Sequence, residues 1–99
     1  MEILNYIPTG SQNAVKRKYL VAATGLKDRD FRDAVSEARL KIPIVNLSDG
    51  RGYFIPDMND ESDQNKLLLF VMQEESRAKE ILARVDVAKQ TLRNCGVID

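Results

Sequence analysis

Two arginines on one predicted helix are the residues of this sequence best placed to do chemistry. Arg29 and Arg32 are three residues apart in the segment 27 to 41, so a helix puts both side chains on its polar side. A guanidinium group can bind the O6 and N7 atoms of guanine with two hydrogen bonds, which is worth about 1–3 kcal/mol of discrimination between bases. The start of this helix carries the residues that would reach base edges in a major groove: Lys27, Arg29, Arg32, Asp33 and Ser36.

Two basic residues outside this helix could contact a nucleic-acid backbone. Arg51 lies in the glycine-rich run 48 to 52, where it would reach a phosphate or the minor groove and fix register more than sequence. Lys16 lies near the start of the preceding helix and could touch a phosphate, or it could belong with its basic neighbours to a solvated helix face. The simple alternative for Arg29 and Arg32 is surface ion pairing on their own helix.

Composition argues against an enzyme. The chain of 99 residues has no histidine and a single cysteine, so it lacks the commonest general base, the commonest zinc ligand and any CxxC metal site. The run Thr9-Gly10-Ser11 lacks the pattern that cradles a nucleotide phosphate. We therefore expect no catalytic residues, no metal, no cofactor and no small-molecule ligand.

The charges cancel over the whole chain but not along it. Fifteen basic and fifteen acidic residues give a net charge of zero, which disfavours binding to nucleic acid by bulk charge. Residues 1 to 55 nevertheless carry nine lysines and arginines against six acids, and the remainder is acidic. This gradient fits a basic binding surface in the first half, although a chain this charged can show such a split by chance.

The sequence predicts a chain that stays in the cytoplasm. It has no run of about 18 apolar residues, and residues 1 to 10 lack the basic start and apolar stretch of a signal peptide. We expect no membrane partner.

Glycine and proline divide the first half into short elements. Residues 1 to 7 form an apolar element that could be a helical turn or a strand. Apolar residues at steps of three and four predict a helix over 13 to 24, capped by Asn13 and ended by Gly25, and a second helix over 27 to 41, stopped by Pro43. Two apolar runs around a glycine-rich tip predict a β-hairpin over 44 to 55, in which Tyr53 and Phe54 are better explained as core residues than as base-stacking residues.

The second half predicts an acidic connector over 57 to 64 and one long helix over 65 to 96. Asp60 or Ser62 could cap this helix, and Gly96 closes it. Its apolar positions follow alternating steps of four and three, interrupted by Glu74, in a seam that could pair two chains. The candidate dimerisation residues are Leu67, Val71, Ala78, Ile81, Val85, Ala88 and Leu92. The seam could instead dock on the chain's own first half, which at about 55 residues is short of core.

Together these elements predict a mainly α fold with a small β-hairpin: a winged helix-turn-helix domain over 1 to 56, followed by the long C-terminal helix. Several runs resemble the small winged helix-turn-helix proteins encoded by phages and prophages of Gram-positive bacteria. The runs that carry the resemblance are 6 to 10, 13 to 14, 24 to 26, 28 to 32, 42 to 44 and 50 to 56. The resemblance implies that 27 to 41 is the recognition helix and 44 to 55 the wing, in a DNA-binding protein of a phage or mobile-element gene cluster with a role such as transcription regulation.

The expected partner is therefore double-stranded DNA, bound by the helix 27 to 41 in the major groove and the wing on the backbone. Asp33 and Glu37 place negative charge near the groove face, which costs affinity and which a homodimer would offset. The rival hypothesis is a protein-interaction adaptor that uses the winged fold as a scaffold and its C-terminal helix as the working surface. The neutral net charge slightly favours this rival.

Overall fold

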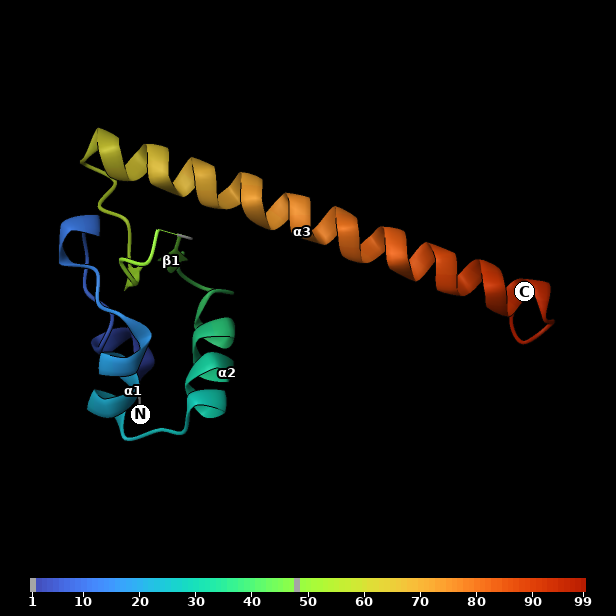
Figure 1. The fold of residues 1–99 in the computed structure, drawn as a ribbon. Coiled ribbons are helices and arrows are strands. Elements are labelled where there is room, and N and C mark those ends of the chain that lie inside the picture. Colours follow the sequence, from blue (N-terminus) through green and yellow to red (C-terminus); the bar gives the residue numbers. More distant parts are fainter. Residues whose placement is uncertain (1, 48) are drawn as a thin grey trace.

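A computed structural model describes residues 2–47 and 49–99 of the chain. The fold is mainly helical, with a small antiparallel hairpin and a long C-terminal helix, as the sequence predicts. Figure 1 shows a small domain formed by the first half of the chain, and the long helix α3 (Glu61–Asn94) lying across it and then extending away.

The chain opens with two short 3-10 turns. The first, η1 (Ile3–Asn5), buries Ile3, so the element that the sequence left open is a helical turn. The second, η2 (Ser11–Asn13), is separate from the helix that follows. The predicted helix start at Asn13 is wrong: helix α1 spans Arg17–Thr24 and its N-cap is Lys16. The amide of Asn13 instead donates to the carbonyl of Thr9 at 3.0 Å, and it steadies the turn before the helix.

Helices α1 and α2 (Asp28–Ala38) are joined by a three-residue turn. Gly25 adopts φ of 72°, a left-handed conformation that glycine takes without steric cost, and its N–H donates to the carbonyl of Val21. The hydroxyl of Thr24 accepts a hydrogen bond from the N–H of Leu26, which fixes the chain as it leaves the turn. The two helices therefore meet at a tight, defined corner.

Helix α2 is shorter than the predicted 27 to 41. It ends at Ala38, and residues 39 to 42 continue as turns whose N–H groups still bond to the carbonyls of Val35, Glu37 and Ala38. Phe31, Val35 and Ala38 are buried as the apolar pattern predicts, but Ile42 is exposed because it lies beyond the last helical turn. Four residues separate the end of the helix from Pro43, so the proline is not what ends α2.

The hairpin lies between two layers of helix. Strands β1 (Val45–Asn46) and β2 (Tyr53–Phe54) pair antiparallel, with Val45 opposite Phe54. Tyr53 packs with the residues of α1 and α2, where its ring meets Phe31 edge-on at 5.5 Å, whereas Phe54 belongs to a second cluster that includes residues of α3. Both strand residues are buried, which confirms the interpretation of Tyr53 and Phe54 as core. Strands this short need such support on both faces.

A third segment extends the hairpin. Val15 forms an antiparallel bridge with Tyr53, and each residue's N–H donates to the other's carbonyl, at 3.1 and 2.8 Å. Gly52, with φ of 110°, lies so close to the backbone of Val15 and Lys16 that a side chain there would overlap it. The residues just before α1 therefore act as a strand and not as the first turn of a helix.

Helix α3 begins at Glu61, before the predicted residue 65, and its N-cap Asp60 accepts a hydrogen bond from the N–H of Ser62. Of the two caps the sequence proposed, Asp60 is the one used. Leu67 and Phe70 pack on the second cluster, with Val45, Leu47 and Phe54. The first three turns of α3 therefore complete the core of the small domain.

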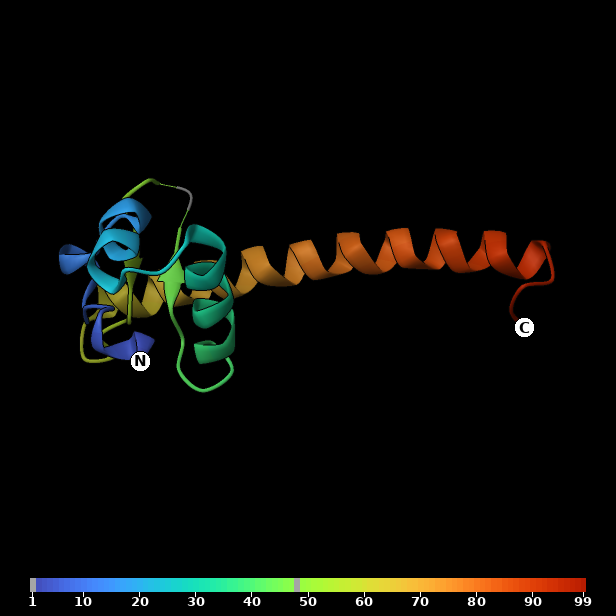
Figure 2. The same ribbon diagram turned by 90° about the horizontal axis from the view of Figure 1, so that it is seen from below.

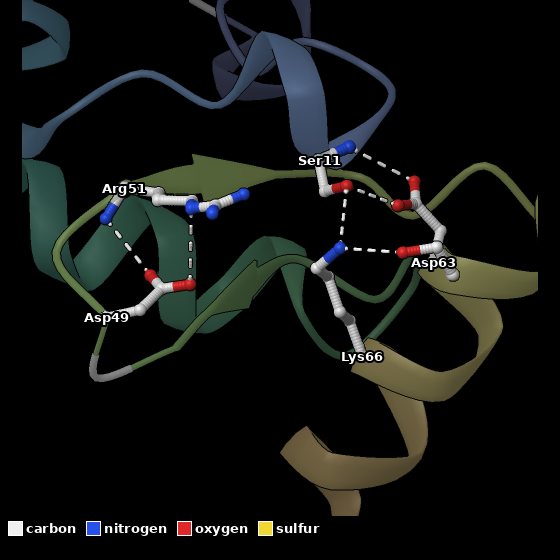
Figure 3. Close-up of polar contacts among 6 residues, drawn as sticks. Ser11, Asp49, Arg51, Asp63 and Lys66 are labelled. Atoms are coloured by element: carbon white, nitrogen blue, oxygen red, sulfur yellow. Dashed lines mark hydrogen bonds and ion pairs between the residues drawn. The ribbon is translucent and has the colours of Figure 1, made fainter.

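A buried carboxylate fastens α3 to the start of the chain. Asp63 is 0% exposed and accepts hydrogen bonds from the N–H of Ser11 at 3.1 Å, the hydroxyl of Ser11 at 2.5 Å and the N–H of Asp57 at 2.9 Å. The ammonium of Lys66 donates to the hydroxyls of Ser11 and Ser62 (Figure 3). Asp63, predicted as part of a solvated connector, is thus a structural residue.

After Phe70 the helix leaves the domain. Figures 1 and 2, which differ by a quarter turn, both show the rest of α3 extending past the domain on its own. Almost every side chain from Val71 onward is exposed, and large apolar ones are among them. Gly96, with φ of 75°, ends the helix.

Candidate nucleic-acid interface

Two shallow hollows adjoin one another where α1, α2 and the hairpin meet. Arg17 and Tyr53 line both of them. The first is completed by Lys16, Lys18, Asn46, Gly50 and Gly52, and the second by Arg32, Val35, Ser36 and Arg39. We call the polar residues of the two hollows the basic face. It joins the start of α1, one side of α2 and the tip of the hairpin.

The basic face contains part of the predicted reading helix. Arg32 and Ser36 line the second hollow, and Arg29 lies on the same side of α2, one turn earlier. All three are exposed. The structure thus brings Arg32 and Ser36 together with Lys16, which the sequence could only propose as separate contacts.

An acidic residue lies among these cations. Asp28 pairs with Arg17 at 3.1 Å and with Arg32 at 3.2 Å, so one carboxylate bridges α1 and α2. All three side chains are about half exposed, and pairs of this kind contribute only tenths of a kcal/mol because water screens them. Ion pairing was the simple alternative for Arg32, and the structure shows it. A stronger anion could still take both guanidinium groups from Asp28 at small cost.

The hairpin tip holds a second such pair. Arg51 lies beside Asp49, with Nε 3.7 Å from the carboxylate, and the same carboxylate accepts the N–H of Arg51 at 3.0 Å (Figure 3). The Arg51 side chain is 65% exposed and is therefore accessible to a phosphate. Gly50 and Gly52, on either side of Arg51, line the first hollow. Arg51 itself lines neither hollow and lies at the tip of the hairpin, beside the first one.

The remaining predicted residues line neither hollow of the basic face. Lys27 is the N-cap of α2, and a lysine cannot accept hydrogen bonds from the first N–H groups of a helix; Asp28 and Asp30 supply negative charge to that turn instead. Asp33 is exposed on α2, one turn after Arg29. Glu37 lines a different hollow with Glu2 and Lys41, on the side of α2 that faces η1. Of the two acids that the sequence placed near the groove, only Glu37 therefore lies on another side of α2.

Sequence reasoning missed Arg17, Lys18, Asn46 and Arg39 of this face, and the two arginines are the most informative of them. Arg17 looked like one cation in a solvated run, because a helix starting at residue 13 would turn it outward. Arg39 was assigned no role; its Nε donates to the carbonyl of Ile44 at 2.9 Å and its guanidinium lies over the ring of Phe70 at 5.3 Å. Arg39 thus ties α2, the hairpin and α3 together at the rim of the second hollow. The spacing of Arg32, Ser36 and Arg39, at steps of four and three along one helix face, is the sequence signal that could have shown Arg39 beside the other two.

The chemistry of the basic face is that of anion binding. Guanidinium and ammonium groups donate several hydrogen bonds and match the geometry and charge of phosphate oxygens. The hydroxyl of Ser36 adds a donor that can also accept. The face is shallow and open, so it suits an extended polyanion better than an enclosed small molecule.

The predicted dimerisation residues divide into two groups. Leu67 packs on the hairpin within its own domain, whereas Val71, Ile81, Val85 and Leu92 are exposed along the rest of α3. Ala78 and Ala88 lie on the same exposed stretch.

Across the described residues, 2–47 and 49–99, no helix combines the length and apolar character needed to cross a membrane. Comparisons with protein-family models, curated proteins and solved structures found no significant match to this chain.

Proposed function

We propose that residues 1 to 56 form a winged helix-turn-helix domain and that its basic face binds double-stranded DNA. The order of elements supports this fold: helix α1, a tight glycine turn, helix α2 and then the hairpin β1–β2. The bridge between Val15 and Tyr53 adds a third short strand beside the hairpin, so that the wing is anchored to the segment that precedes α1. The resemblance to phage-type DNA-binding proteins points the same way.

One observation carries the proposal: Lys16 and Arg17 at the start of α1 and Arg32 on α2 converge on adjoining hollows beside the hairpin tip. A net charge of zero for the whole chain does not weaken the argument, because binding depends on the local potential over the contact surface.

In the proposed mechanism α2 enters the major groove and the other contacts hold it in register. Arg29 and Arg32 reach base edges from the first turns of α2, where bidentate contact with guanine is possible. Lys16 and Arg17 contact phosphates beside the groove, and Arg51 contacts the backbone or the minor groove from the wing. Asp28 releases its two arginines to the DNA and then opposes binding, because its charge stays close to phosphate.

Fluorescence anisotropy with a labelled random duplex, from about 50 to 200 mM salt, tests the proposal. Three phosphate contacts, from Lys16, Arg17 and Arg51, predict a slope of log K against log salt of about −2.7 and a loss of affinity of roughly 40-fold across this range. Arg17→Ala/Arg32→Ala should weaken binding and reduce the slope to about −1.8.

Lys41→Ala is the matched control. Lys41 is an exposed cation of the same domain but lines the hollow on the η1 side, with Glu2 and Glu37. It should leave the affinity and the slope almost unchanged. Equal losses in Lys41→Ala and in the double variant would mean that binding follows total charge, and the basic face would have no special role.

The second candidate function is a protein-interaction adaptor. The observation that favours it is the exposed apolar surface of α3 beyond Phe70, which includes Leu82 at 60% and Val87 at 70% exposure. In this reading the small domain is a scaffold and α3 is the contact surface. The DNA titration separates the two candidates: an adaptor predicts no binding of the folded protein to DNA even at low salt.

A further inference from the structure

The part of α3 beyond the small domain is a long helix with an apolar seam and no core of its own to cover. We call residues 71–94 the projecting segment; at 1.5 Å per residue it is about 36 Å long. Its apolar positions recur at steps of three and four, and the central ones are open to solvent: Ile81 is 54% and Val85 38% exposed. An isolated helix in water gains little from such a seam, which favours pairing with another helix.

A second copy paired in the parallel direction would be opposed by its own charges. In-register parallel pairing places each seam residue opposite itself, so Glu74 would face Glu74 of the partner subunit within the seam. The positions that flank a parallel seam would bring Arg84 beside Lys89 of the partner subunit, again like against like. Both contacts cost stability.

We propose that the projecting segment pairs with that of a second copy in the antiparallel direction. In the proposed register, Ile81 faces Val85 of the partner subunit at the centre of the pair. Outward from the centre, Ala78 faces Ala88 of the partner subunit and then Glu74 faces Leu92 of the partner subunit. The two Glu74 carboxylates are then far apart at opposite ends, and each remains paired with Arg77 of its own helix at 3.2 Å. The alanine layers allow the two helices to approach closely.

Charge complementarity fixes this register. On one side of the antiparallel seam, Glu75 lies opposite Lys89 of the partner subunit, and symmetry repeats this pair. The exposed Leu82 side chains of the two chains lie between the two pairs. On the other side the two Arg84 residues come near each other, and each is already offset by Glu80 on its own helix, 3.9 Å away. Shifting the register so that Ile81 faces Ala78 of the partner subunit would require Leu67, which is held in the second hydrophobic cluster. The opposite shift, with Ile81 facing Leu92 of the partner subunit, would separate Glu75 from Lys89 of the partner subunit.

The length of the helix fits the same arrangement. In this register the last helical residue of the partner subunit, Asn94, lies opposite Met72, just after the last residue that packs on the domain, Phe70. The projecting segment therefore pairs along its whole length, and the partner helix ends where the small domain begins. The two small domains come to lie at opposite ends of the paired helices. This inference does not depend on DNA binding.

Light scattering on the full chain at several concentrations tests the pairing. We expect a mass of about twice 11.2 kDa. Ile81→Asp puts a charge into the central layer twice and should raise the dissociation constant by more than about 10²-fold, which leaves monomers. Val87→Asp is the matched control, because Val87 is also an exposed β-branched residue of the same helix but lies away from the seam. It should leave the mass unchanged, and circular dichroism should show folded protein in both variants.

The single cysteine of the chain tests the direction. In the antiparallel pair the two Cys95 residues lie at opposite ends, so mild oxidation of the wild-type protein should give no disulfide-linked dimer. Val71→Cys places a thiol opposite Cys95 of the partner subunit and should give a dimer that survives denaturation without reductant. These two positions are too far apart along one helix to form the bond within a chain.

The charge pairs test the register. Glu75→Lys should weaken the dimer by about tenfold, and Lys89→Glu combined with it should restore the affinity. The proposal would be overturned by a wild-type mass of one chain or by a mass above two chains. It would also be overturned if oxidation linked wild-type Cys95 and Val71→Cys added no further link.

Discussion

Asp63 holds the start of α3 against the N-terminal turn, and its replacement has effects whose size follows from the contacts. Three donors converge on its carboxylate: the N–H groups of Ser11 and Asp57 on one oxygen, and the hydroxyl of Ser11 on the other. Asp63→Asn can keep the amide oxygen on the two N–H groups while its NH2 donates to the Ser11 hydroxyl. The geometry survives but the charge is lost, so charge-assisted hydrogen bonds become neutral ones, at a cost of about 1–2 kcal/mol.

Asp63→Ala removes the acceptor altogether. It leaves the N–H groups of Ser11 and Asp57 without their partner, and each unsatisfied donor costs about 1–3 kcal/mol. Because Ser11 and Asp57 are themselves only half-buried, water can reach them after a small rearrangement. We therefore expect a total near the lower end, about 3 kcal/mol. Glu61→Gln is the control: Glu61 is exposed in the same first turn of α3, and its loss should cost less than about 0.5 kcal/mol through the helix dipole.

Acid unfolding gives a second signature of Asp63. Burial by itself would raise its pKa, but the hydrogen bonds from the Ser11 side chain and from the N–H groups of Asp57 and Ser11, together with the charge of Lys66, outweigh it and hold the pKa below the ordinary value of 3.8. The folded state therefore favours the ionised form. Its contribution to stability is fully present above about pH 4 and is lost as the pH falls through the lower folded pKa.

Urea unfolding of the three variants, followed by circular dichroism at pH 7 and again near pH 3, measures these effects. We expect Glu61→Gln to be the most stable of the three variants, Asp63→Asn to come next and Asp63→Ala to be the least stable. Acidification should lower the free energy of unfolding less for Asp63→Asn than for wild type. If Asp63→Asn and Asp63→Ala were both as stable as Glu61→Gln, the carboxylate would not fasten α3 to the domain, and the reasoning from its hydrogen bonds would be refuted.

Three further predictions concern the small domain and its basic face. Asp28→Asn should raise affinity for duplex DNA several-fold in the anisotropy titration, because it removes a negative charge beside phosphate and releases two arginines; a loss of affinity would show that Asp28 positions them productively. Gly52→Ala should lower stability by more than about 3 kcal/mol in thermal unfolding, because the added methyl overlaps the backbone of Val15, whereas Gly50→Ala, which meets open space, should cost only about 1 kcal/mol. Arg39→Gln should cost about 1–2 kcal/mol by weakening the contact between α2 and α3; an unchanged urea midpoint would contradict it.

The order of elements could be predicted because each is marked by a local physical signal. Gly25 marks the left-handed turn between α1 and α2, and two apolar runs around a glycine-rich tip mark the hairpin. The burial of both Tyr53 and Phe54 goes further than alternation suggests. It occurs because the hairpin has helices on both faces, α1 and α2 on one and α3 on the other.

The start of α1 could not be placed because its residues satisfy two patterns at once. Ala14 and Val15 fit the apolar stripe of a helix, yet Val15 pairs with Tyr53 in the sheet and Ala14 packs on the second cluster. That choice is made by a strand about forty residues away in the sequence, which local periodicity does not contain. The shift of the helix start is also what brings Arg17 to the basic face.

The structural roles of Asp63 and Arg39 depend on long-range contacts in the same way. In the sequence Asp63 is one acid among several in an acidic run, and its burial follows from the return of α3 to Ser11 at the start of the chain. Arg39 follows the last residue of α2, and only the position of Phe70 on α3 shows what it stacks against. The position of a polar residue in the sequence does not show which distant group will hydrogen-bond to it or pair with its charge.

We propose that DNA binds where α1, α2 and the hairpin tip converge, and this contact can be located by NMR. Backbone amide shifts of the isotope-labelled full chain, followed by NMR while a short duplex is added, locate the contact directly. We expect the largest shifts at residues 16–18, 27–36 and 49–53, with little change along the projecting segment. Shifts confined to α3, or on the side of α2 that faces Glu2 and Lys41, would contradict it.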